Sequence, residues 1–175
     1  METIIWKNSD LSGKRFDFET TTESIGTLTV LSELSSNAFF ATDKDRLQFS
    51  RAGFWDNKVL ISKNGQLIGE IRNQLLGQTY IELKNGNKFW LSSNLIGRNL
   101  KWLRAKGQPI VEYKMATLNS MRKGFIKVGD SLTKDEREIL LSAGLIAGRF
   151  NLYRLTLGIM ILAFLLHATS KVIGY

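Results

Sequence analysis

The chain has no cysteine and very little histidine or proline. The absence of cysteine from all 175 residues excludes disulfides, thiolate metal sites, iron–sulfur clusters and cysteine nucleophiles. His167 is the only histidine, so a multi-histidine metal cage is excluded and a Ser–His–Asp triad would need that one imidazole. With a single proline and 15 glycines, the chain must build its turns largely from glycine and its usual partners.

Motifs for catalysis are equally scarce. No glycine-rich loop leads from a strand into a Lys-Ser/Thr helix start, which a phosphate-binding loop requires. His167 falls in the most apolar part of the chain, where a packed neutral imidazole is expected. Asp135, Glu136 and Glu138 belong to the first turns of a predicted helix, where the helix dipole favours acidic side chains without a catalytic role. We therefore expect no enzymatic activity, no cofactor and no metal.

Positive charge is concentrated in the middle of the chain. The formal net charge is +8, yet residues 1–50 carry five basic and eight acidic side chains, a net of −3. Between Lys84 and Lys127 ten basic residues face one acid, Glu112. Such a stretch suits a polyanion, although lysines on strand edges also serve solubility alone. We predict an anionic-lipid-binding surface formed by Lys84, Lys88, Arg98, Lys101, Arg104, Lys106, Arg122, Lys123 and Lys127.

Residues 1 to about 128 have the pattern of antiparallel strands. Apolar and polar residues alternate over 15–19, 26–34 and 46–50. Asn64-Gly65 and Asn85-Gly86 lie between β-rich runs and predict hairpin turns, and Lys106-Gly107 suggests a third.

Two stretches that precede these turns resemble each other. Residues 75–83 and 95–103 both contain an apolar pair, a glycine, and then a strand that ends in leucine. This repeated pair of strands favours a meander of hairpins over alternating strands and helices. Among the aromatic residues that interleave with the basic ones, Trp90, Trp102 and Tyr113 could anchor at an interface or stack on bases, but strand aromatics are more typical of a core.

The character of the chain changes after Gly129. Thr133 and Glu136 have the spacing of a capping box, which predicts a helix over 133–148. A second helical run covers 151–171, and residues 155–168 carry no formal charge with His167 neutral. A helix that is apolar on all sides is buried in protein or in lipid. At this length the second helix is either a core helix or a C-terminal membrane anchor.

The pattern predicts a mainly β fold with α-helix at the C-terminus. Residues 1–150 would form an antiparallel, closed or nearly closed β-barrel with the following helix at 133–148. Residues 151–175 would form an apolar C-terminal helix, and one option for this helix is to thread through the barrel. Because the chain begins Met1-Glu2-Thr3 and no long apolar run follows, we expect no signal peptide and a cytoplasmic, membrane-associated protein.

Residues 62–72 and 101–113, with the apolar C-terminal helix, resemble the tubby-like superfamily, which includes LURP-one-related proteins and phospholipid scramblases. The resemblance implies a closed barrel of about twelve strands threaded by a hydrophobic helix, and it implies phosphoinositide binding through basic residues. The chain departs from the pattern in having two apolar helical segments, and in lacking a cysteine-rich stretch for lipid modification.

The expected function is thus a non-enzymatic module that recognises anionic phospholipid at the cytoplasmic face of a membrane. A soluble barrel that holds a small apolar ligand is the alternative, provided that the terminal helix lies outside the barrel. A structural or interaction protein without a ligand is a further alternative. Nucleic acid is a conceivable partner, but no recognition helix, RNP-like or GXXG pattern supports it.

Overall fold

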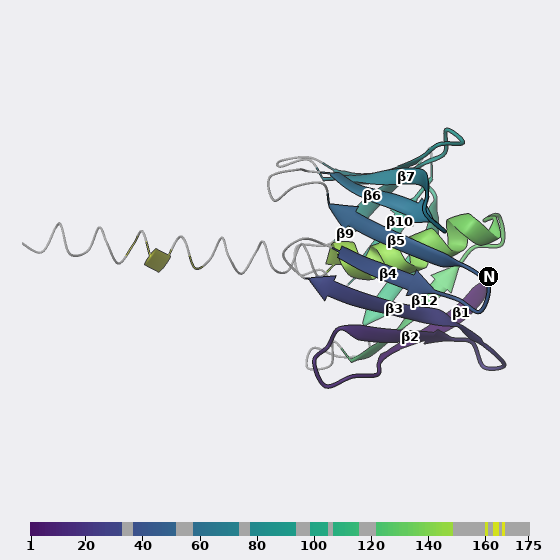
Figure 1. The fold of residues 1–175 in the computed structure, drawn as a ribbon, viewed down its shortest axis with the longest axis horizontal. Helices are drawn as coiled ribbons and strands as arrows, with labels where there is room; N and C mark the ends of the chain where they lie inside the picture. Colours follow the sequence, from purple (N-terminus) through teal and green to yellow (C-terminus); the bar gives the residue numbers. More distant parts are fainter. Residues whose placement is uncertain are drawn as a thin grey trace, which may run out of the picture.

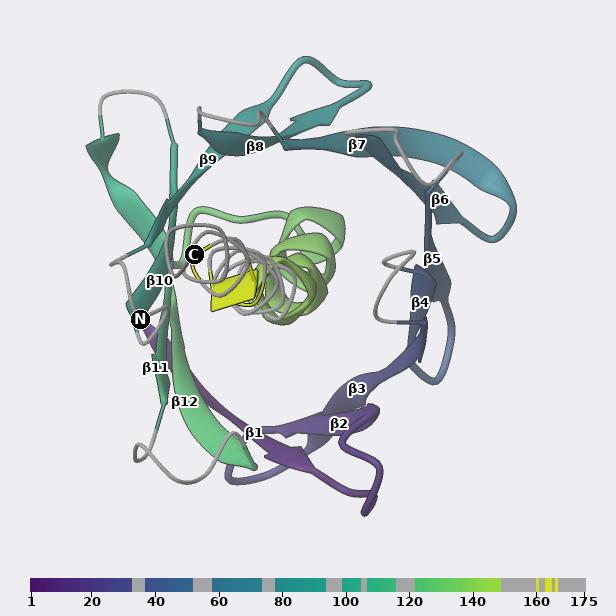
Figure 2. The ribbon, with the colours of Figure 1, turned by 90° about the vertical axis from the view of Figure 1, so that its left-hand side faces the viewer.

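Twelve antiparallel strands close into a barrel around one helix (Figures 1 and 2). The computed structural model describes residues 1–32, 37–51, 58–73, 78–93, 99–104, 107–115, 122–148, 160, 163, 164 and 166. The strands are β1 (Glu2–Asn8), β2 (Arg15–Glu19), β3 (Ser24–Ser32), β4 (Asn37–Ala41), β5 (Arg46–Arg51), β6 (Lys58–Lys63), β7 (Gln66–Asn73), β8 (Thr79–Leu83), β9 (Lys88–Ser93), β10 (Asn99–Leu103), β11 (Pro109–Met115) and β12 (Lys123–Val128).

Each strand pairs with its neighbour in sequence, and β1 pairs with β12 to close the ring. In that closing pair Ile4 lies opposite Ile126, and Trp6 lies opposite Gly124. This order confirms the predicted meander and closed barrel. Closure removes the sheet edges that twelve strands would otherwise expose.

The hairpin turns differ in type. Asn64 and Gly65 have positive φ angles of 49° and 86°, as a two-residue type I′ turn requires. At the second Asn-Gly only Gly86 has a positive φ, 87°, and its amide donates to the carbonyl of Leu83. That loop is therefore a type I turn followed by a left-handed glycine. Both Asn-Gly pairs thus form the predicted hairpins.

The predicted helix at 133–148 is observed over residues 134–148, inside the barrel (Figure 2). We call it the central helix. Its capping box is formed: the Thr133 hydroxyl accepts from the Glu136 amide at 3.3 Å, and Glu136 accepts from the Thr133 amide at 3.0 Å. Beyond the first turn the helix is buried on all sides, from Ile139 to Ala147. The barrel wall therefore supplies the apolar surroundings that such a helix requires.

Two aromatic side chains fasten the helix to the wall. The indole of Trp102 donates to the carbonyl oxygen of Leu140 at 3.2 Å. The hydroxyl of Tyr113 donates to the same carbonyl, and to that of Leu141 at 3.0 Å. Burial raises the pKa of Tyr113. Trp102 and Tyr113 thus belong to the core, as is typical of strand aromatics, whereas Trp90 is half-buried.

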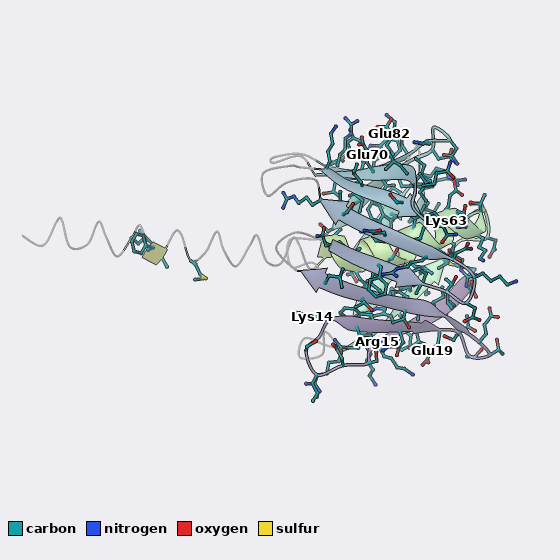
Figure 3. All side chains as sticks on the ribbon, in the orientation of Figure 1. Lys14, Arg15, Glu19, Lys63, Glu70 and Glu82 are labelled. Carbon is teal, nitrogen blue, oxygen red and sulfur yellow. The ribbon has the colours of Figure 1, made fainter. Side chains whose placement is uncertain are left out.

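The barrel has two rims, which we name after the end of the central helix that lies at each. The N-rim, where the central helix begins, carries the connections 20–23, 42–45, 64–65, 84–87, 104–108 and 129–133. The C-rim, where the helix ends, carries the connections 9–14, 33–36, 52–57, 74–78, 94–98 and 116–122. Lys63 lies at the N-rim and Lys14 at the C-rim, at opposite ends of the side view (Figure 3).

Candidate functional site: the C-rim

The nine predicted lipid-binding residues do not form one compact patch. Arg98 and Lys106 lie outside the described residues. The other seven lie on one side of the barrel, from the turn before β9 to β12, but they are spread over its length. Lys84, Lys88 and Arg104 lie at or beside the N-rim, and Arg122 and Lys123 lie at the C-rim.

Lys101 and Lys127 lie on the outer face of the wall between these groups. Both are register partners of Glu112 on β11, which therefore separates them.

Three of the seven have acidic partners. The ammonium of Lys88 lies 2.7 Å from the Glu82 carboxylate, and this pair holds the pKa of Glu82 below its usual range. Lys101 lies 3.1 Å from the carboxylate of Glu112. The guanidinium of Arg104 lies 3.4 Å from the buried carboxylate of Glu136, the helix-capping residue. These cations support the wall and the helix, and their charge is compensated.

The N-rim as a whole uses its charges to hold the central helix. Lys63 contacts Asp135 at 2.8 Å and Asp45 at 3.1 Å. Arg137 lies 2.7 Å from the carboxylate of Glu2, a charge contact without hydrogen-bond alignment. The predicted structural role of the acids in the first helical turns is therefore visible in these contacts.

Glu138 differs from the other acids of the first helical turns, because one of its buried carboxylate oxygens is unsatisfied among the described residues. It is 3% exposed, and desolvation raises its pKa although Lys134 opposes the shift. One of its carboxylate oxygens has no hydrogen-bond partner in the described part of the chain. The side chain lines a cavity of about 250 Å³ together with Lys44, Lys134 and Arg137. Water bridging the unpaired oxygen is the ordinary occupant of a polar space of this kind.

Four exposed cations at the C-rim have no acidic partner among the described residues: Lys14, Lys114, Arg122 and Lys123. We call them the C-rim cations. Barrel closure places their segments on one side of this rim, because β11, β12, β1 and β2 are successive in the ring and the carbonyl of Arg122 accepts from the Asn8 amide at 2.5 Å, which joins the end of β1 to the start of β12. Loop 9–14, which carries Lys14, follows directly.

Asp10 shapes that loop. Its carboxylate accepts hydrogen bonds from the hydroxyl of Ser12 and from the backbone amides of Lys14 (2.8 Å) and Arg15 (3.1 Å). These bonds, that from Ser12 first, hold the pKa of Asp10 below its usual range. The carboxylate of Asp10 thus accepts hydrogen bonds within its own loop and forms no ion pair with the side chain of Lys14.

Sequence reasoning missed Lys14 and Lys114 as site residues. Lys14 lies in the acidic N-terminal third, and only closure of the ring places it on the same side of the rim as β12, with β1 between them. Lys114 belongs to the basic stretch and could have been found there, since it occupies an outward position on β11.

Apolar side chains are exposed at the same rim. Leu11 in loop 9–14 is 99% exposed, and Leu31 near the end of β3 is 59% exposed. The connections of the C-rim contain ten large apolar residues by sequence, counting Leu, Ile, Met, Phe and Trp, against one, Leu132, in those of the N-rim. Most of the ten lie outside the described residues. The contrast in composition nevertheless follows the two rims.

The remaining predicted features concern the C-terminal segment. His167 and most of residues 151–171 lie outside the described residues, and the choice between a core helix and a membrane anchor falls on them. Residues 160, 163, 164 and 166 are helical, and the side chains of Met160, Phe164 and Leu166 are exposed. Within the described part of the chain no helix is both long and apolar enough to cross a bilayer. Nor do the described residues gather three or more metal-ligating side chains.

Comparisons with family models, with curated proteins and with solved structures returned no match. The twelve strands and the threaded helix agree with the fold that the tubby-like resemblance implies, but agreement in fold does not name a family. The resemblance therefore stays a prediction.

Proposed function

We propose that this protein is a non-enzymatic module that docks its C-rim on an anionic phospholipid membrane. The observation that carries the proposal is the group of four C-rim cations without acidic partners, beside the fully exposed Leu11. This surface differs from the one predicted from the sequence. It keeps Arg122 and Lys123, adds Lys14 and Lys114, and leaves out the predicted residues that lie at the N-rim, on the wall or outside the described residues.

The charge is sufficient for reversible adhesion. A basic residue close to an anionic leaflet contributes about 1 kcal/mol, so the four C-rim cations together contribute about 4 kcal/mol. Paired cations such as Lys88 contribute less, because their acidic partner is repelled by the same surface. At physiological ionic strength the Debye length is about 8 Å, so only a rim in contact with the headgroups gains this attraction.

The course of the chain supports the same orientation. The central helix ends at the C-rim, and the uncharged run 155–168 begins seven residues later. An apolar segment and a polybasic surface are two independent membrane signals, and stable attachment usually takes two. Because anionic lipids are enriched in the cytoplasmic leaflet, we propose the cytoplasm as the side of attachment.

The test compares two triple variants with equal loss of charge. Lys114→Gln, Arg122→Gln and Lys123→Gln together alter the C-rim. The matched control combines Lys44→Gln, Lys84→Gln and Lys127→Gln, three exposed lysines away from that rim. The binding constant of the full chain is measured by sedimentation with phosphatidylserine-containing vesicles and with phosphatidylcholine vesicles. The ratio of the two constants reports the electrostatic part of binding, because the apolar segment contributes to both.

We expect the C-rim variant to lose this preference by about 100-fold, as three contributions of about 1 kcal/mol require, and the control to lose less than about threefold. Added salt should weaken the preference of the parent protein. Equal losses in both variants would show that net charge rather than the C-rim drives binding. A parent protein without preference for anionic vesicles would also refute the proposal.

A further inference from the structure

The central helix does not fill the barrel completely at the C-rim. A cavity of about 220 Å³ remains between the helix, β1, β2 and β10. Its closed side is formed by the buried side chains of Trp6, Phe16 and Leu100. Leu11 and Arg122, which are exposed, mark its open side. The space is therefore apolar in depth and carries one cation at the mouth.

A buried donor lies in this wall without a partner. The indole of Trp6 is 2% exposed, and its N–H has no hydrogen-bond acceptor in the described part of the protein. The ring is held in place from two sides: Phe16 packs edge-on at 5.8 Å between ring centroids, and Gly124 leaves room for it on β12. A Cβ on Gly124 would come within 2.6 Å of the indole nitrogen. Buried donors of this kind are rare and call for an acceptor.

Asp10, the acid that lines the cavity, makes no ion pair with Arg122. Asp10 is committed to the hydrogen bonds of loop 9–14 described above, and Asn8 accepts from the Asp10 amide at 3.0 Å. The guanidinium of Arg122 is left to meet an anion from outside.

We propose that this cavity binds the alkyl chain of an anionic amphiphile, with the anionic group at Arg122 and the chain against Trp6, Phe16 and Leu100. Apolar cavities of about 150 Å³ bind benzene, so 220 Å³ accommodates roughly eight carbons of a chain. The carboxylate or phosphate pairs with the guanidinium fork of Arg122 at the mouth. The inference goes beyond the proposed function, because a monomeric acid tests it without a membrane.

Two kinds of molecule combine an alkyl chain with an anionic group in this way: a free fatty acid and a membrane phospholipid. Two arms of one experiment distinguish them in the full-length protein. In the first, 8-bromooctanoate is titrated as a monomer, and quenching of tryptophan fluorescence is measured. In the second, vesicles carry phospholipid brominated on the acyl chain. Vesicle sedimentation is scored separately, so failure of the proposed function is distinguished from failure of this one.

We expect saturable quenching in at least one arm. Trp6→Phe should abolish the saturable component, whereas Trp90→Phe, which alters a half-buried tryptophan away from the cavity, should keep it. Quenching by the monomeric acid alone identifies a fatty-acid site, and quenching by the brominated vesicles alone identifies a membrane lipid. Both results support the cavity. The absence of saturable quenching in both arms, or its survival in Trp6→Phe, overturns the inference.

Two further variants test the role of each end of the ligand. Arg122→Gln should weaken binding by about tenfold, the usual effect of losing a charged hydrogen bond, while Lys127→Gln, on the outer face of the wall away from the C-rim, should leave it unchanged. Leu145→Phe places a larger ring in the cavity and should block binding while the chain stays folded. Equal affinity of 8-bromooctanol and the acid would show that Arg122 holds no anion and would refute the assignment of the mouth.

Discussion

Gly144 is the position at which the place of the helix inside the barrel can be tested most directly. A Cβ built on Gly144 would lie less than 3.0 Å from the aromatic ring and hydroxyl of Tyr113, a separation that real Cβ atoms essentially never show. The ring has no free direction in which to move, because it is buried and its hydroxyl is bound to the carbonyls of Leu140 and Leu141. Gly144→Ala should therefore destabilise the protein.

The magnitude follows from three contributions. Alanine in place of glycine in a helix stabilises by about 1 kcal/mol. Overpacking of a filled core costs about 1–3 kcal/mol, and displacement of the Tyr113 hydroxyl from its acceptors costs about 1–2 kcal/mol more. The expected net loss is about 1–4 kcal/mol. For a chain of this size that corresponds to a fall in Tm of roughly 2–16 °C.

Thermal and urea unfolding followed by circular dichroism measure this loss, with Gly148→Ala as the matched control. Gly148 lies in the same helix, but its added Cβ would meet only Leu100 Cδ1 at 2.7 Å, the far end of a flexible side chain. The control should remain within about 0.5 kcal/mol of the parent protein. If Gly144→Ala were as stable as the parent or more so, the helix would not lie against Tyr113 and the core described above would be wrong.

Three further predictions concern the N-rim. Because burial raises the pKa of Glu138, the folded state binds the carboxyl proton more tightly than the unfolded state does. Stability should therefore fall as pH rises from the usual carboxyl range through the raised pKa. A plot of the urea midpoint against pH should show this fall in the parent protein and lack it in Glu138→Gln. The pKa of Asp45 is held low chiefly by Lys63, so its contribution should be lost as pH falls through the lowered pKa, and Asp45→Asn should flatten the acid side of the same profile. Thr133→Ala should cost about 1 kcal/mol by removing the cap, and Thr133→Ser should restore most of it.

The fold was largely predictable because its signals are local. Alternation marks the strands, and the two Asn-Gly pairs mark hairpins whatever the rest of the chain does. The closing pair of β1 and β12 was expected only on general grounds, since no local signal joins residues more than a hundred positions apart. Likewise, the capping box located the start of the central helix, but an apolar helix has the same pattern whether protein or lipid surrounds it.

The site was predicted less well, and the geometry of a meander explains why. Successive antiparallel strands run in opposite directions, so residues close in sequence alternate between the two rims. The basic stretch from Lys84 to Lys127 is therefore spread along the barrel, and Lys14 joins Arg122 only through closure. Cross-strand pairing also compensates part of the charge, as Glu112 does for Lys101, and register cannot be read from composition.

A bilayer would accommodate residues 139–147 as readily as the barrel does, so the apolar part of the central helix does not by itself explain why it stays inside. The explanation lies in its first turns, where five successive charged residues occupy 134–138. Carrying such residues through a membrane costs about 2.5–3.5 kcal/mol for each Lys, Arg or Asp. At the N-rim they meet partners already in place, such as Lys63 for Asp135 and Arg104 for Glu136. The charges in the first turns of the helix thus hold it at the N-rim. The C-rim cations have no acidic partner among the described residues and lie at the rim that exposes Leu11, which is why we place the binding surface there.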